Sequence, residues 1–388
     1  MDQLHYRFNK LLLETNTHYH RYMYNHIHWD SRMIGLTGPR GVGKTTLILQ
    51  YIKENLSTND SLYVTAEDFY FASHRLLELA DNFVKYGGKH LFIDEIHRYP
   101  EWSKELKLIY DYHPELQVVF TGSSVLDIHK GVADLSRRAI MYNMQGLSFR
   151  EYLLFFHDIK FPTYTLDDIL KCKVEIPPLF HPLQYFADYL RKGYYPFHLD
   201  NLGIYLQQIV NITLESDIPQ YAGMNVSTGR KLKQLLAIIS QSVPFKPNIS
   251  GIATALNVSR NSVADYCLYL EEAGLIAQLR DDTGGIRGLG KVNKIYLDNT
   301  NLIFTIAGEK AEIGNVRETF FLNQMRVNQD VIASSLSDFC INEYTFEIGG
   351  RKKGNKQING VPNAYLIKDD IEFAFGNTIP LWYFGLNY

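Results

Sequence analysis

The stretch that decides the fold is an eight-residue turn, Gly38-Pro39-Arg40-Gly41-Val42-Gly43-Lys44-Thr45. The apolar run Met33–Thr37 precedes this turn, and the helix-forming stretch Thr46–Glu54 follows it. A glycine-rich turn of this spacing between a strand and a helix is typical of a phosphate-binding loop, because its glycines let backbone N–H groups surround phosphate oxygens. We therefore expect nucleotide binding by Gly38, Pro39, Arg40, Gly41, Val42, Gly43, Lys44, Thr45 and Thr46. Within this set, Lys44 is expected to reach the β- and γ-phosphates as a catalytic cation, and the Thr45 hydroxyl is expected to hold Mg²⁺.

A second apolar run, His90–Ile93, ends in the acidic pair Asp94-Glu95. The carboxyl end of such a buried strand lies at the edge of the sheet where ligands bind. We expect Asp94 to orient the hydrated Mg²⁺ and Glu95 to polarise the attacking water. The base-reading pattern Asn-Lys-x-Asp of GTP-binding proteins is absent from the sequence, so ATP is the predicted nucleotide.

Two further features are candidates for the same site. The run Gln117–Thr121 leads into a cluster of small polar residues, in which Ser123 is the candidate sensor of the γ-phosphate and Thr121 and Ser124 are alternatives. A plain serine-containing turn is the competing interpretation. Arg138, the second residue of an arginine pair, is the candidate for stabilising charge on the transferred phosphoryl group, with a solvated surface pair as the alternative.

The first 146 residues predict an α/β domain. Five short apolar runs alternate with helical stretches, which indicates a parallel sheet covered on both faces; the runs are Met33–Thr37, Ser61–Thr65, His90–Ile93, Gln117–Thr121 and Ala139–Asn143. The predicted domains are a P-loop ATPase domain with a helical lead-in at 1–146, a helical linker or lid at 147–227, a winged-helix domain at 228–310 and a small α+β domain at 311–388.

The third predicted domain has a helix–turn–helix outline. Helices are expected at Gly229–Val243, Ile249–Leu256 and Ser259–Ala273, with strands at Leu275–Leu279 and Lys294–Leu297 around a glycine-rich turn. Ser259–Ala273 is the predicted recognition helix for double-stranded DNA, with Arg260 and Asn261 at its start. Basic residues expected along the wing are Arg280, Arg287, Lys291 and Lys294. Acidic residues nearby would repel phosphate, so a protein partner is the alternative.

Composition sets limits on partners and location. The formal charge of −3 provides no global attraction to nucleic acid or to an anionic membrane, so DNA binding requires a local patch. The sequence contains no apolar stretch of the roughly 20 residues that a membrane span needs, and its start lacks a signal-peptide pattern. Its three cysteines, Cys172, Cys267 and Cys340, show no metal-ligand spacing. We expect reduced thiols and a cytoplasmic protein.

With these motifs identified, the chain resembles a family of bacterial and archaeal AAA-type (AAA+) ATPases that carry a C-terminal domain of unknown function. Leu135-Ser136-Arg137-Arg138 lies where the family usually has a Gly-Arg pair, so Arg138 matches the arginine and Arg137 departs from the glycine. The family's tail usually resembles a PD-(D/E)xK nuclease, and here Ile371–Phe373 and a predicted last strand, Ile379–Gly385, occupy the corresponding positions. Trp382, Tyr383 and Phe384 replace the acid and the lysine of that chemistry, so the resemblance implies a degenerate nuclease.

Two functions fit these observations. The first is an ATP-hydrolysing protein that couples its nucleotide state to movement of the winged-helix and nuclease-like parts, assembled at least transiently as a homo-oligomer in which a neighbouring copy supplies an arginine. The alternative is a nucleotide-gated switch that captures a protein partner, with slow hydrolysis and no role on DNA.

Overall fold

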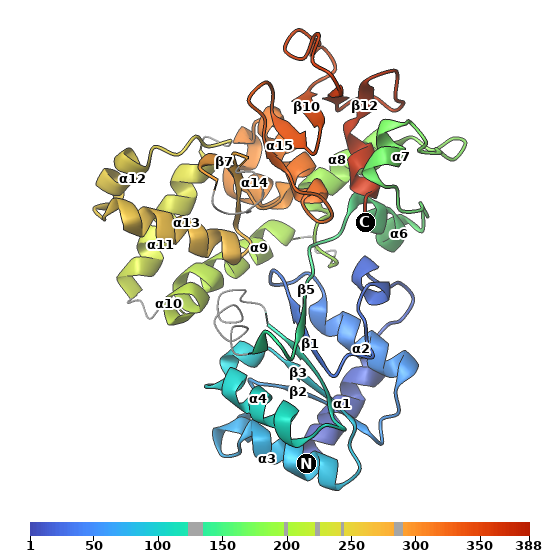
Figure 1. Cartoon of the computed structure of the whole chain (residues 1–388), viewed down its shortest axis with the longest axis vertical. Coiled ribbons are helices and arrows are strands. Elements are labelled where there is room, and N and C mark those ends of the chain that lie inside the picture. The colour runs from blue at the N-terminus through green and yellow to red at the C-terminus, as the bar shows by residue number, and fades with distance from the viewer. Residues whose placement is uncertain (123–134, 198–200, 222–225, 242–243, 283–289) are drawn as a thin grey trace. The chain divides into compact units, whose positions relative to one another are not determined.

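The computed structural model describes residues 1–122, 135–197, 201–221, 226–241, 244–282 and 290–388 (Figure 1). The chain divides into two compact units, Met1–Gly146 and Leu147–Tyr388. The finer division of the second unit into three domains stays a prediction.

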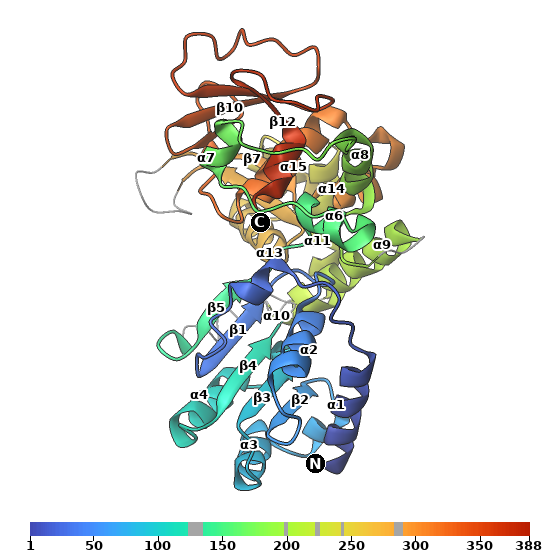
Figure 2. The same ribbon diagram turned by 90° about the vertical axis from the view of Figure 1, so that its right-hand side faces the viewer.

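The first unit is built on a five-stranded parallel sheet with the strand order β2-β3-β4-β1-β5. The strands are β1 (Met33–Thr37), β2 (Ser61–Thr65), β3 (His90–Asp94), β4 (Gln117–Thr121) and β5 (Ile140–Asn143). The helices are α1 (Asp2–Glu14), α2 (Lys44–Asn55), α3 (Leu76–Lys85) and α4 (Trp102–Tyr112). Figures 1 and 2 show α1 and α2 on one face of the sheet and α3 and α4 on the other. The predicted α/β class is confirmed for this unit, with strand bounds within one residue of those expected.

The sequence pattern explains this arrangement. The first four strands are almost wholly buried, so apolar side chains fill both faces of the sheet. The connection from β1 leads to β2 at the edge of the sheet. The connections from β2 to β3 and from β3 to β4 lead in the opposite direction, from that edge back toward β1. Right-handed crossovers therefore place α2 on one face and α3 with α4 on the other. On α1, the buried residues Leu4, Phe8 and Leu12 recur every four positions and form the face that packs inward.

The second unit contains a larger set of helices. These are α6 (Phe149–His157), α7 (Leu166–Leu170), α8 (Pro182–Lys192), α9 (Leu202–Ile212), α10 (Ile218–Tyr221), α11 (Val226–Ser240), α12 (Ile249–Leu256), α13 (Arg260–Glu272), α14 (Thr300–Ala307) and α15 (Ile313–Met325). Their starts follow ordinary capping rules. Ser148 accepts a hydrogen bond from the Glu151 N–H while the Glu151 side chain returns to the Ser148 N–H, so α6 begins at a capping box.

Two sheets accompany these helices. An antiparallel pair joins β6 (Ile276–Arg280) to β7 (Val292–Leu297), and Phe245 forms an isolated bridge with Ile295 of β7. The other sheet has the order β12-β11-β10-β9-β8 and combines parallel and antiparallel pairs. Its strands are β8 (Ile332–Ala333), β9 (Phe339–Ile341), β10 (Tyr344–Gly349), β11 (Ala364–Lys368) and β12 (Thr378–Pro380). The Phe321 ring of α15 packs against Phe339 and Phe346 of this sheet, at centroid distances of 5.1 and 5.2 Å.

The tail differs from the prediction in two places. The run expected as a last strand, Ile379–Gly385, is only a three-residue strand, β12, followed by a 3₁₀ helix at Leu381–Leu386 whose residues are all buried. Ile371–Phe373 lies outside the strands, after β11. Every residue of this apolar run is buried, so its hydrophobicity shows no alternation that would distinguish a strand from a helix. The contacts with surrounding residues then determine which of the two forms.

Candidate nucleotide-binding site

The predicted phosphate loop connects the end of β1 to the start of α2. Its glycines adopt backbone angles that side chains resist, with φ of 144° at Gly38, 84° at Gly41 and 97° at Gly43. A Cβ atom at Gly38 would lie 2.1 Å from the carbonyl oxygen of Met144, which follows β5. The first N–H groups of α2 have no acceptor within the helix. The loop therefore joins an open backbone and a helix N-terminus, the arrangement that favours phosphate.

Lys44 is the buried cation of this loop. Its ammonium donates hydrogen bonds to the carbonyl oxygens of Gly38 (2.8 Å) and Pro39 (2.9 Å). Burial lowers the pKa of Lys44 to about 8, against the opposing influence of the Glu95 and Asp94 carboxylates, and Arg40 lowers it further. An anion placed in the loop would restore the charged form of Lys44, because it offsets the cost of desolvating the ammonium.

Asp94 is the centre of a hydrogen-bond cluster at the carboxyl edge of the sheet. Its Oδ2 accepts from the Thr45 hydroxyl (2.6 Å) and from the Tyr63 hydroxyl (2.7 Å). Its Oδ1 accepts from the Thr121 hydroxyl and from the Glu95 N–H (3.1 Å). The parallel register brings these groups together, since the ends of β2, β3 and β4 lie side by side. The carboxylate next to the loop is therefore fixed in orientation from four directions.

Glu95 follows β3 in a left-handed backbone conformation, with a φ of 50°. Such a conformation is uncommon for a residue with a side chain, and strained residues concentrate at functional sites. The Glu95 N–H also lies 3.3 Å from the Thr121 hydroxyl oxygen. Its side chain keeps 22% of its surface exposed, whereas the neighbouring Asp94 is 5% exposed. The more accessible of the two carboxylates is the one predicted to act on water.

His97 is a buried neighbour of Glu95 that the sequence did not reveal. Its Nε2 lies 3.5 Å from Glu95 Oε2, and among the described residues neither ring nitrogen has a hydrogen-bond partner. Burial lowers the pKa of His97 to about 3, and the cations Arg98, Arg40 and Lys44 add to this effect. The imidazole is therefore neutral at physiological pH and lies against the candidate catalytic carboxylate.

Two more residues of this site escaped sequence analysis. The Tyr63 hydroxyl binds Asp94 from the middle of β2, and burial and the adjacent carboxylate raise the pKa of Tyr63. Arg21 is 4% exposed, and its guanidinium donates to the carbonyl oxygens of Val42 in the loop and of Gln145 and Gly146 beyond β5 (2.8 Å each for the last two). Neither residue belongs to a motif. The pairing of β2 with β3 brings Tyr63 to Asp94, and the backbone contacts of the guanidinium reveal Arg21.

The remaining predicted residues lie elsewhere. Arg138 precedes β5 and thus lies at the amino edge of the sheet, opposite the phosphate loop. There it forms a two-pronged ion pair with Asp111, with both nitrogen–oxygen distances at 3.0 Å. The structure does not bring Arg138 together with Lys44 or Glu95 of the same chain. Ser123 and its alternative Ser124 lie outside the described residues, and Thr121, the other alternative, contacts Asp94.

The donor set fits Mg²⁺ bound together with a nucleotide. Mg²⁺ prefers oxygen ligands and is usually held by one or two protein groups, with water and phosphate oxygens completing its shell. The Thr45 hydroxyl and the Asp94 carboxylate supply such oxygens beside the loop. Across the described ranges, no three His, Cys, Asp or Glu residues form a cluster suited to a metal ion, so an all-protein metal cage is not found there.

The fold and this geometry define the class of a P-loop nucleotide-binding protein. Residues 30–153 match a family model described as an AAA domain, which supports an AAA-type ATPase. Residues 183–312 match a model described as a domain of unknown function (DUF8612). No curated protein matches the chain. In the part of the chain that the structure describes, no helix has both the length and the apolar character needed to cross a bilayer.

Solved structures similar to this chain include three at low sequence identity. A chain from work on katanin self-assembly is 18% identical, with 34% of this chain and 48% of that chain covered and a TM-score of 0.25. AMPPCP-bound DnaA from Aquifex aeolicus is 12% identical, with 68% and 86% covered and a TM-score of 0.24. PCH-2 from C. elegans is 17% identical, with 68% of each chain covered and a TM-score of 0.26. The match therefore spans about half the length of the katanin chain.

Proposed function

We propose that this chain binds and hydrolyses ATP with Mg²⁺ at the phosphate loop. The observation that carries this proposal is the cluster at the carboxyl edge of the sheet, where Asp94 accepts hydrogen bonds from Thr121 and from Thr45, the residue that follows the loop's lysine. A chance glycine turn would not place a buried lysine, a hydroxyl and two carboxylates at the same edge. The match of residues 30–153 to an AAA domain supports the same function.

Each residue has a distinct task in this proposal. The loop N–H groups and the Lys44 ammonium bind the β- and γ-phosphates, and the Thr45 hydroxyl and Asp94 carboxylate hold Mg²⁺ or its waters. When bound there, Mg²⁺ would neutralise part of the phosphate charge that develops during transfer. Glu95 accepts a hydrogen bond from the attacking water and orients it toward the γ-phosphorus. Tyr63 and Thr121 keep Asp94 in place, and Arg21 fixes the loop backbone.

Steady-state ATPase activity with and without Mg²⁺ tests this function. Glu95→Gln keeps the shape of the side chain and removes its charge, and we expect turnover to fall about 10²-fold or more while ATP still binds. Glu101→Gln is the matched control, because Glu101 is exposed and pairs only with the nearby Lys104 in the described structure. Wild-type turnover no higher than that of Glu95→Gln would refute hydrolysis and leave a nucleotide-binding switch.

The position of Arg138 bears on how its guanidinium could take part in hydrolysis. Its guanidinium is remote from its own loop, so it would contribute to hydrolysis only across an interface between two copies. We therefore propose a homo-oligomer, at least transient, as the active form. Turnover per chain that is independent of protein concentration, with Arg138→Ala unchanged, would contradict this assembly.

For the second unit, we propose that residues 228–310 form a winged helix. The order α11, α12, α13, β6, β7 supports it, and so does the isolated bridge that pairs Phe245 with Ile295 of β7. Arg260 and Asn261 are exposed at the start of α13, as a recognition helix requires. The wing is less favourable to DNA: Arg280 pairs with Glu271 (3.0 Å), and Lys294 pairs with Glu318 (3.2 Å) and Asp338 (3.3 Å).

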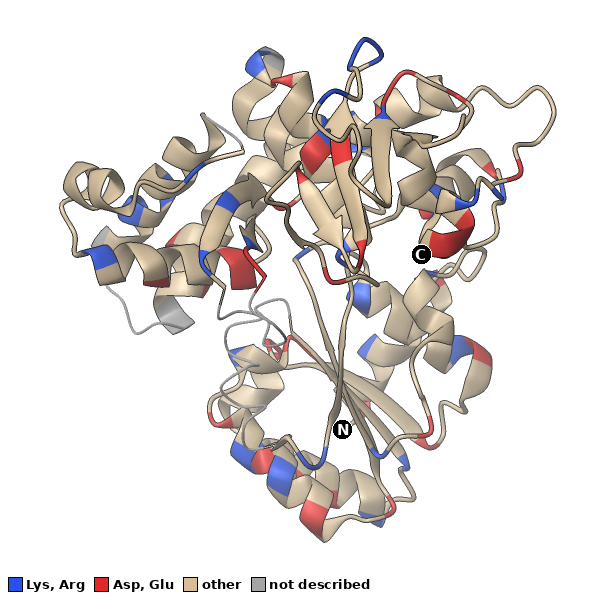
Figure 3. Ribbon diagram, turned by 45° about the horizontal axis from the view of Figure 1, so that its top comes forward, with Lys and Arg blue, Asp and Glu red and all other residues tan. Residues whose placement is uncertain are grey.

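This mixture of charges keeps the protein partner as a second candidate. Figure 3 shows acidic and basic residues interspersed over the helices of this region. Adding double-stranded DNA to the ATPase assay separates the two: stimulation that Arg260→Ala abolishes supports action on DNA. Turnover that depends on Glu95 but ignores DNA supports a nucleotide-gated switch that binds a protein.

For residues 311–388 we propose a degenerate nuclease-like domain, since Trp382 and Tyr383 are buried aromatics that neither bind metal nor activate water.

A further inference from the structure

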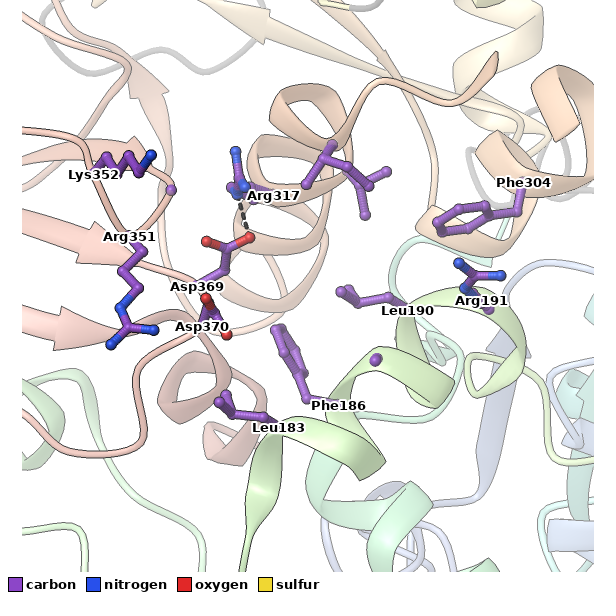
Figure 4. A pocket seen from close by; sticks show the side chains of 14 residues that line it. Leu183, Phe186, Leu190, Arg191, Phe304, Arg317, Arg351, Lys352, Asp369 and Asp370 are labelled. Atoms are coloured by element: carbon purple, nitrogen blue, oxygen red, sulfur yellow. Dashed lines mark hydrogen bonds and ion pairs between the residues drawn. The ribbon is translucent and has the colours of Figure 1, made fainter. Parts of the chain in front are cut away.

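A cavity of about 590 Å³ lies within the second unit, and none of the residues assigned to the ATPase site lines it (Figure 4). Helices α8, α14 and α15 form its floor, and the turns that follow β10 and β11 form its rim. This volume falls within the range of cavities that bind small organic molecules. Nothing in the proposed ATPase chemistry uses it.

The floor is apolar because two helices present apolar stripes to it. On α8, Leu183, Ala187 and Leu190 are spaced by four and three residues and share one face of the helix. On α15, Ile313 and Val316 do the same, and Ile313 keeps 49% of its surface exposed at the lip. Phe186 and Phe304 add aromatic surface. An apolar stripe left open toward solvent is unfavourable unless a ligand covers it.

The rim carries an excess of positive charge. Arg317 and Asp369 neutralise one another in an ion pair, drawn as the dashed line in Figure 4. Arg191, Arg351 and Lys352 make no ion pair among the described residues, and only Asp370 opposes them in the lining. The Arg191 guanidinium lies 5.4 Å from the centre of the Phe304 ring, so this cation is held over the apolar floor.

We propose that this cavity binds an amphipathic organic anion, with an apolar body on the floor formed by α8 and α15 and an acidic head group at the cationic rim. Both halves of the lining are needed for this choice. A purely apolar ligand would leave the excess positive charge of the rim without an anionic partner from the ligand. A phosphodiester backbone would pair with the cations and leave the apolar floor uncovered, so nucleic acid fits this site less well than a carboxylate or sulfonate with a hydrocarbon body.

The probe is 8-anilinonaphthalene-1-sulfonate, whose fluorescence rises in apolar surroundings, added to the full-length protein and displaced by decanoate. We expect saturable binding that decanoate displaces, whereas decylammonium and inorganic phosphate do not displace the probe. The double variant Arg351→Glu/Lys352→Glu changes two exposed side chains. It should weaken binding about tenfold, because two screened attractions become repulsions. Ile313→Asp should also weaken binding of the probe, because it places a negative charge in the apolar lip of the cavity.

Lys356→Glu is the matched control, because Lys356 is an exposed lysine of the same segment that does not line the cavity. Its affinity for the probe should stay within about twofold of the wild-type value. Far-ultraviolet circular dichroism and the thermal midpoint of each variant establish that it is folded. The inference is overturned by binding that is not saturable, by equal displacement with decylammonium, or by a double variant that binds as tightly as Lys356→Glu. Displacement by inorganic phosphate as efficient as that by decanoate would also overturn it, since the apolar body would then be irrelevant.

Discussion

Replacing Thr121 by valine tests the cluster that holds Asp94. Valine matches threonine in shape but has a methyl group where the hydroxyl was, and Thr121 is fully buried at the end of β4. The hydroxyl donates to Asp94 Oδ1 and lies 3.3 Å from the Glu95 N–H as an acceptor. A hydrogen bond to a charged group contributes about 1.5–3 kcal/mol, and the new methyl group also lies against a carboxylate. We expect the free energy of unfolding to fall by about 2–3 kcal/mol.

Urea unfolding measures this loss, provided that the slope with denaturant is unchanged. Thr65→Val is the matched control at the end of β2, because within the described residues the Thr65 hydroxyl accepts just one long contact, from the Glu67 N–H (3.4 Å). Its cost should stay below about 0.5 kcal/mol. In ATPase assays, Thr121→Val should lower kcat/KM about tenfold and raise the Mg²⁺ concentration needed for half-maximal turnover, since Asp94 loses one of its four restraints. Equal stability of the two variants, with turnover unchanged, would refute the role of this hydroxyl.

Three further substitutions probe the surroundings of the loop. Arg21→Lys keeps the charge but loses the fork that reaches three carbonyl oxygens, so ATP affinity measured by calorimetry should fall about tenfold; unchanged affinity would contradict a bracing role. His97 is neutral when folded, and protonating the unfolded chain favours unfolding as the pH falls from about 6.5 toward 3. His97→Gln should therefore lose less stability than wild type between pH 7 and pH 4, and parallel stability curves would count against this. Gly38→Ala should destabilise the protein by about 3 kcal/mol or more, whereas Gly87→Ala, also at positive φ but with open space around it, should cost about 1–2 kcal/mol; similar thermal midpoints would rule out the clash with Met144.

The sequence predicts the first unit well because its signals are local. Each strand is a short apolar run, and the phosphate loop is defined by glycines whose positive φ no other residue adopts easily. The two catalytic candidates, Asp94 and Glu95, follow directly from a strand end. The sheet order supplies what these signals lack. Tyr63 reaches Asp94 because β2 pairs with β3. The sequence of an apolar strand does not indicate which other strand lies beside it.

Arg138 shows what a closer use of topology adds. It precedes its strand, and in a parallel sheet a residue before a strand lies at the amino edge, away from the ligand-binding edge. His97 and Arg21 were not predictable in this way, since a histidine or an arginine outside a motif is most often a surface residue. The tail was predicted wrongly at Leu381–Leu386, where a run buried on all sides forms a 3₁₀ helix rather than a strand.

The clamp formed by Arg21 has a mechanical consequence. One planar guanidinium ties the phosphate loop at Val42 to Gln145 and Gly146, and Gly146 is the last residue of the first unit. Gly38 also packs against the backbone of Met144, so closely that an added Cβ atom would lie 2.1 Å from the Met144 carbonyl oxygen. A displacement of the loop at Val42 would therefore act, through Arg21, on the two residues that precede Leu147. One arginine side chain therefore connects the phosphate-binding backbone to the residues that end the first unit.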